Sequence, residues 1–180
     1  AASLAGFPAE NVRAIPWDER FRVRVDLLAG RIAADREAGL TPFFVCGNAG
    51  TTNTGAVDDL GALADLCTRE QIWFHVDAAY GGGALAAKSV RHLFNGIERA
   101  NSVTIDPHKW LFSPYDCGAV IYRNPELAKQ AHAQEGSYLD IFSDEGAQGF
   151  NPSDYQIQLT RRVRGLPLWF SLATHGTDRY

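Results

Sequence analysis

The stretch IWFHVDAAYGGG at residues 72–83 decides the fold class of this 180-residue chain. Its first five residues form a short apolar run, which is typical of a buried strand in an α/β sheet. Asp77 follows this run directly, and ligands of open α/β sheets bind at the carboxyl ends of the strands. The stretch therefore predicts a strand that ends in a ligand site. Small residues beside Asp77 leave room for a flat ligand to approach the backbone: Ala78, Ala79, Gly81, Gly82 and Gly83.

Similar units of strand, loop and helix recur on both sides of this stretch. Short apolar segments alternate with amphipathic ones, which predicts an α/β domain with a mostly parallel sheet flanked by helices. A long loop rich in Gly, Ser, Asp and Asn is expected at about 135–156, and such loops are usually functional or mobile. We expect strands at 11–15, 42–46, 72–76, 102–105 and 119–123, and helices at 26–38, about 60–67, 88–95, 125–134 and 159–173.

The composition gives no sign of a nucleic-acid or membrane partner. The formal net charge is −4, the isoelectric point is near 5.7, and the basic residues are scattered. No apolar run approaches the roughly 20 residues that cross a bilayer, and no signal peptide is visible. Cys46, Cys67 and Cys117 lie far apart without a CxxC spacing, which fits a reduced, cytoplasmic location. The chain contains no methionine, so we expect a central piece of a longer protein.

Reactive side chains follow three of the predicted strands. Thr52, Asp77, and the adjacent pair His108 and Lys109 each come shortly after one of them. Because the carboxyl ends of parallel strands share one edge of a sheet, we expect these side chains to converge. A lysine that faces a carboxylate suits pyridoxal phosphate (PLP). A lysine binds the aldehyde of PLP as an imine, and the pyridine nitrogen needs an acid to stay protonated.

Taken singly, each of these residues has an ordinary structural interpretation. An Asp after a strand is usually a turn former, and a Lys in a loop is normally solvated. His75, Asp77 and His108 are suitable metal ligands by type, but no local pair has the spacing of a zinc protease motif. A nucleotide-binding module would need a GxGxxG or Walker pattern, which the sequence lacks. We therefore predict PLP and no metal from the combined pattern.

The segments HVDAAYGGG at 75–83 and SVTIDPHKWLF at 102–112 resemble the signature of the group II PLP-dependent amino-acid decarboxylases. This family includes the aromatic-L-amino-acid decarboxylases, and the resemblance spans most of the chain. It implies that residues 1–180 form an incomplete large domain of the PLP-dependent transferase fold, type I. An N-terminal segment and a small C-terminal domain are then expected outside this chain.

The resemblance also implies roles for individual residues. Lys109 matches the Schiff-base lysine, and Asp77 matches the acid that pairs with the pyridine nitrogen. Ala79 matches the small residue that lies against the face of the cofactor ring. Thr52 matches a threonine that contacts the cofactor, and His108 matches a residue near the phosphate and the lysine.

Three further residues complete the predicted site. Ser102 and Asp106 precede the lysine and join the cofactor-binding set. The Asp106 position is an amide in the animal aromatic decarboxylases, where it helps to hold the phosphate, whereas an acid repels a phosphate dianion. Tyr138 matches a tyrosine of the mobile catalytic loop, which protonates the substrate carbon across the dimer interface. With Tyr138, the predicted catalytic set is Lys109, Asp77, His108 and Tyr138.

The function implied by the resemblance is decarboxylation of an L-amino acid to the amine and CO2 by a homodimer. Aromatic substrates are favoured, although the glycines at 81–83 also resemble the glutamate branch. Family members with Phe in place of Tyr138 tend to form aldehydes, so Tyr138 favours simple decarboxylation. The open alternatives are another fold-type I enzyme (aldehyde synthase, lyase or aminotransferase) and an inactive piece with a structural role.

Overall fold

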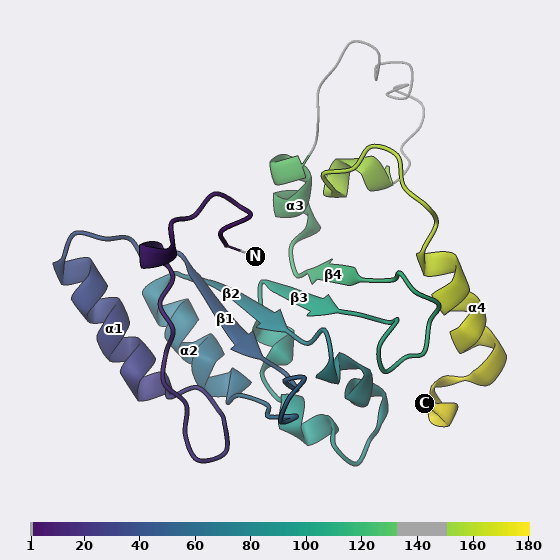
Figure 1. Cartoon of the computed structure of the whole chain (residues 1–180), viewed down its shortest axis with the longest axis horizontal. Coiled ribbons are helices and arrows are strands. Elements are labelled where there is room, and N and C mark those ends of the chain that lie inside the picture. The colour runs from purple at the N-terminus through teal and green to yellow at the C-terminus, as the bar shows by residue number, and fades with distance from the viewer. Residues whose placement is uncertain (1, 133–150) are drawn as a thin grey trace, which may run out of the picture.

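A four-stranded sheet forms the centre of the computed structural model, which describes residues 2–132 and 151–180. The strands lie in the order β1-β2-β3-β4 (Figure 1). The first three strands are parallel and β4 is antiparallel to β3, so the predicted mostly parallel sheet is confirmed. The strands are β1 (Phe44–Asn48), β2 (Trp73–Asp77), β3 (Ser102–Ile105) and β4 (Ala119–Tyr122).

The described residues form four α-helices beside the sheet, and capping residues explain where the second one begins and ends. The Asp59 side chain accepts a hydrogen bond from the Ala62 amide (2.9 Å) at the N-terminus of α2. Gln71 ends that helix in the left-handed conformation, with φ at 54°. The helices are α1 (Val25–Glu37), α2 (Leu60–Glu70), α3 (Pro125–His132) and α4 (Gly165–His175).

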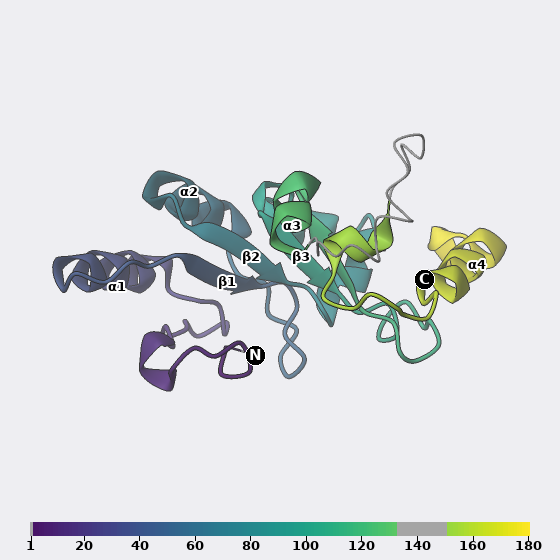
Figure 2. The same ribbon diagram turned by 90° about the horizontal axis from the view of Figure 1, so that it is seen from above.

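The hydrophobic core lies between α2 and one face of the sheet. Phe74 and Val76 of β2 point into it and are almost fully buried, as are Leu63 and Cys67 of α2. Figure 2 shows α2 and α3 on the same side of the sheet, with the N-terminal segment on the other side. Since side chains alternate along a strand, His75 and Asp77 lie on the face opposite this core. None of the described helices is long and apolar enough to cross a membrane.

The strand predicted at 42–46 lies two residues later, as β1, and three other predicted elements differ more strongly from the structure. Residues 11–15 form no strand, because they pair with no neighbour; the first of them ends a 3-10 turn (Ala9–Asn11). The helix expected at 88–95 is only a 3-10 turn (Arg91–Phe94). The last helix begins at Gly165 and not near residue 159. Pro167 then lies in its first turn, where a backbone amide has no intrahelical partner to lose.

A buried carboxylate fixes the loops at the end of β1. Asp58 is only 4% exposed, and its side chain accepts hydrogen bonds from the amides of Val23 and Asn48, both at 2.7 Å. The Asn48 side-chain amide donates to the same carboxylate at 3.4 Å. Asp58 therefore ties the Trp17–Val23 bridge to the carboxyl end of β1.

Candidate functional site

The loops that follow β1 and β2 touch through their backbones. The Gly81 amide donates to the Gly50 carbonyl oxygen at 3.1 Å. A Cβ atom at Gly81 would lie 2.4 Å from the Ala49 carbonyl oxygen and 2.5 Å from the Gly50 Cα. Gly50 itself has φ at +89°, a conformation that favours glycine. The two loops therefore form one unit at the carboxyl edge of the sheet.

Asp77 is the last residue of β2, and a backbone amide orients its side chain. The Asp77 Oδ1 atom accepts a hydrogen bond from the Ala79 amide at 3.0 Å, and Asp77 is otherwise exposed. The carbonyl oxygen of Ala79 accepts a hydrogen bond from the Asp106 amide at 3.2 Å. Ala79 thus connects the acid at the end of β2 to the turn that follows β3.

Lys109 lies in that turn, beside an acidic side chain. Its amide donates to the Asp106 carbonyl oxygen at 2.9 Å, and its Nζ atom lies 2.9 Å from Asp106 Oδ2. The Lys109 side chain is 34% exposed, so the amine remains accessible. A Cβ atom at Gly83 would lie 2.8 Å from the Trp110 Cβ, which shows how closely the lysine turn packs on the glycine run.

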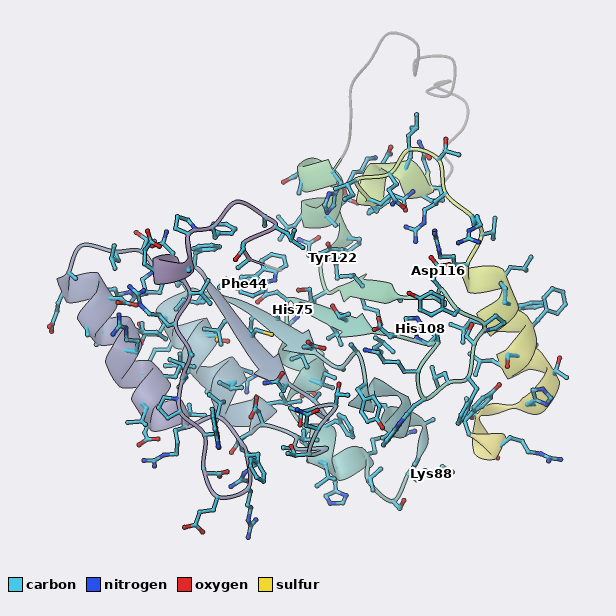
Figure 3. The ribbon with its side chains drawn as sticks, in the orientation of Figure 1. Phe44, His75, Lys88, His108, Asp116 and Tyr122 are labelled. Atoms are coloured by element: carbon cyan, nitrogen blue, oxygen red, sulfur yellow. The ribbon has the colours of Figure 1, made fainter. Side chains whose placement is uncertain are left out.

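His108 is held by the backbone of the loop before β4. Its Nδ1 atom lies 3.1 Å from the Cys117 amide and 2.6 Å from the Cys117 carbonyl oxygen, which leaves Nε2 for other partners. The ring also makes an edge contact with Tyr115, with 5.0 Å between centroids. Asp116, labelled near His108 in Figure 3, binds Arg162 at 2.8 Å and Arg164 at 3.1 Å. These ion pairs join the segment before α4 to the His108 loop.

The structure brings some predicted residues to this edge and not others. Asp77, Ala79, Asp106 and Lys109 are joined by the contacts above, and Thr52 is exposed in the loop that Gly50 begins. Ser102 is the first residue of β3, so at about 3.3 Å per residue it lies roughly 10 Å from the carboxyl end of that strand. Tyr138 lies outside the described residues.

Sequence reasoning missed the network around His75, which it placed in the sheet without a role. The His75 Nδ1 atom lies 2.7 Å from Ser102 Oγ, and Nε2 lies 3.1 Å from Thr104 Oγ1. Ser102 Oγ also accepts a hydrogen bond from Trp73 Nε1 at 2.9 Å. The ring stacks on Phe44, with centroids 5.8 Å apart (Figure 3). Burial lowers the pKa of His75 below its usual 6.5, although the nearby Asp77 charge acts in the opposite direction.

This lowered pKa predicts that stability falls on acidification. The unfolded chain binds a proton at His75 below about pH 6.5 while the folded protein resists it, so the free energy of unfolding decreases as the pH drops through 6.5. We expect a larger loss for the wild type than for His75→Gln between about pH 7.5 and about pH 5.5. Urea unfolding at the two pH values measures this difference. Equal losses in the two proteins would contradict it.

The residues at this edge fit PLP by their chemistry. Lys109 provides an accessible amine, Asp77 an oriented carboxylate, and Ala79 with the glycines a surface without large side chains. Among the described residues, no group of three or more His, Cys, Asp or Glu could hold a metal ion. The arrangement is therefore suited to a flat carbonyl cofactor bound through a lysine.

Comparison with known proteins agrees with this chemistry. The pyridoxal-dependent decarboxylase conserved domain matches residues 1–180. An aromatic-L-amino-acid decarboxylase of Bacillus atrophaeus is 41% identical over 100% of this chain and 38% of its own length. Tryptophan decarboxylase TDC1 of Camptotheca acuminata is 40% identical over 98% of the chain and 36% of its own length. The chain thus spans little more than a third of these relatives.

Solved structures show the same fold. Oryza sativa TDC with PLP and tryptamine has a TM-score of 0.92 at 36% identity, covering 99% of this chain and 37% of that one. Catharanthus roseus tryptophan decarboxylase in complex with L-tryptophan has a TM-score of 0.86 at 32% identity, covering 98% and 36%. The predicted fold type I is therefore confirmed, and the chain belongs to the pyridoxal-dependent decarboxylase family.

Proposed function

We propose that this chain carries the lysine-bearing part of a decarboxylase that converts an L-amino acid, preferably an aromatic one, to its amine and CO2. One observation carries the proposal: the Lys109 amine and the Asp77 carboxylate occur on adjacent turns that the Ala79–Asp106 hydrogen bond holds together. The aromatic decarboxylases among the similar proteins support the reaction and the substrate class.

Each residue has a defined task in this proposal. Bound PLP would supply a ring that accepts the electron pair of the breaking bond between Cα and the carboxylate. Asp77 holds a proton at the ring nitrogen, and Ala79 supports the face of the ring. Lys109 would hold the cofactor through its amine until the amino group of the substrate replaces it there. His108 keeps its Nε2 atom for proton transfer, because the Cys117 backbone engages Nδ1.

The remaining site assignments are also part of the proposal. Tyr138 returns a proton to the substrate Cα after CO2 has left. Thr52 and Asp106 face the cofactor from the loops, and Ser102 remains the third predicted cofactor-binding residue besides its contact with His75. We further propose a cytoplasmic homodimer in which the loop at about 135–156 serves the partner's site.

A second candidate is an aldehyde synthase. A phenylacetaldehyde synthase of a Rosa hybrid cultivar is 38% identical over 98% of this chain, nearly as similar as the decarboxylases. The Tyr138 side chain separates the two functions: a tyrosine protonates the carbon and yields the amine, whereas a phenylalanine cannot donate a proton. We therefore expect Tyr138→Phe to shift the product from amine toward aldehyde.

Product analysis tests the proposal. The PLP-loaded protein is given L-tryptophan, L-tyrosine, L-phenylalanine or L-glutamate, and CO2, amine, aldehyde and peroxide are measured. We expect CO2 and amine in equal amounts from at least one aromatic substrate. Aldehyde with peroxide from the wild type would support the second candidate, and keto acid without CO2 would exclude both.

The attachment point has its own test. Borohydride reduction of the PLP-loaded protein, followed by peptide mapping, is expected to label Lys109 and to leave Lys88 and Lys129 unlabelled. The Lys109→Ala variant serves as the control and is expected to carry no label. A label on Lys88 or Lys129 in the wild type would contradict the assignment of Lys109.

A further inference from the structure

The partner of the Lys109 amine is a carboxylate three residues earlier in the same turn. Lys109 Nζ and Asp106 Oδ2 lie 2.9 Å apart, and the two side chains are 34% and 20% exposed. Both groups are thus partly shielded from water, which strengthens their attraction relative to that of a fully exposed pair. The other two lysines differ: Lys129 lies 3.8 Å from its carboxylate partner, Asp154, and Lys88 is exposed.

Backbone contacts on two sides fix the position of Asp106. Its amide donates to the Ala79 carbonyl oxygen (3.2 Å), and its carbonyl oxygen accepts from the Lys109 amide (2.9 Å). A Cβ atom built on Gly118 would lie 3.1 Å from Asp106 Oδ1, so one carboxylate oxygen packs against the residue that precedes β4. The other oxygen, Oδ2, faces the amine. The backbone of Asp106 is therefore held in place without help from the lysine side chain.

A carboxylate in this position suits a cation better than a phosphate. Next to a phosphate dianion its charge would be repulsive, whereas next to an ammonium group it is attractive. Lys109 provides such an ammonium group when it is not bound to the cofactor. An ion pair of this kind also restricts a long side chain that would otherwise sample many rotamers.

We propose that Asp106 is a positioning residue that holds the unattached Lys109 amine at the cofactor edge of the sheet. It does so in the cofactor-free protein and after the amino group of the substrate has displaced the lysine. Lys109 would then stay close to the cofactor, to which it must bind again. This role rests on the proposed function for its purpose, but the ion pair itself can be tested without cofactor or substrate.

Labelling of the cofactor-free protein tests the proposal. Acetic anhydride is added in trace amounts, and acetylation at each lysine is quantified by peptide mass spectrometry, with Lys88 and Lys129 as internal references. Loss of the carboxylate frees the amine, so Asp106→Asn is expected to raise the Lys109 to Lys88 labelling ratio about three-fold, a typical effect for a partly exposed ion pair. Asp106→Glu, which keeps the charge, is expected to stay near the wild-type ratio.

Salt provides a second test that needs no substitution. About 1 M sodium chloride screens a partly exposed ion pair, so the ratio is expected to rise in the wild type and to stay constant in Asp106→Asn. The proposal would be overturned if salt left the wild-type labelling ratio unchanged and Asp106→Asn had the same ratio as the wild type. Because cofactor is absent throughout, a protected Lys109 in a protein that releases no CO2 would uphold the ion pair and reject only the decarboxylase function.

Discussion

The Asp77→Ala variant of the PLP-loaded protein is expected to have a kcat about a thousand-fold below that of the wild type, as when a group that stabilises transition-state charge is lost. The reason is electrostatic. In the proposed site the Asp77 carboxylate, oriented by the Ala79 amide at 3.0 Å, would keep the ring nitrogen of bound PLP protonated, and a protonated ring is the better electron acceptor. Release of CO2 under saturating substrate measures the effect.

Two controls separate this effect from a loss of structure. The turn of Lys109 is held by the Ala79–Asp106 backbone bond, which the Asp77 side chain does not make. Borohydride is therefore still expected to label Lys109 in Asp77→Ala. Asp77→Glu, which keeps a carboxylate, is expected to retain more activity than the alanine variant. An alanine variant within ten-fold of the wild-type kcat would contradict the role given to Asp77.

A second large effect is expected on stability. Asp58→Ala removes the buried acceptor for the Val23 and Asn48 amides, both bound at 2.7 Å, and leaves these partly buried donors without a partner. Unmade hydrogen bonds to a buried charged group typically cost a few kcal/mol, so we expect unfolding to become easier by about 3 kcal/mol. Urea unfolding followed by circular dichroism gives this difference.

The neighbouring residue is a matched control. Asp59 is also an aspartate, but it is exposed and caps α2 through one hydrogen bond to the Ala62 amide. Loss of such a cap typically costs about 1 kcal/mol, so Asp59→Ala is expected to be clearly the milder variant. If the two variants were equally stable, Asp58 could not be the residue that fixes the end of β1.

The strands around the site were predictable because each is a short apolar run that ends in a polar or small residue. The alternation within residues 72–77 places Phe74 and Val76 in the core and Asp77 at the edge, and the structure has both features. The segment at 11–15 has a similar pattern but pairs with no strand. This could not be predicted, because local sequence does not reveal whether a free sheet edge lies nearby.

Contacts between distant segments were not predictable. Asp58 and Asp59 are adjacent aspartates just before α2, and only the fold assigns Asp59 to the helix and Asp58 to Val23, 35 residues away. The Asp106 side chain likewise has no local signal that distinguishes a phosphate contact from an ion pair with Lys109. Both outcomes depend on how loops pack, and a linear pattern does not contain this information.

The contact between Gly50 and Gly81 limits how this site can be redesigned. Any side chain at position 81 would push against the Ala49 carbonyl oxygen, so a change there displaces the loop that carries Thr52 as well as its own. Libraries intended to alter substrate choice should therefore vary exposed positions such as 53 and 54 and leave both glycines fixed. Mutations that accumulate in evolution are limited in the same way, because the two loops can diverge in sequence around these glycines but not at them.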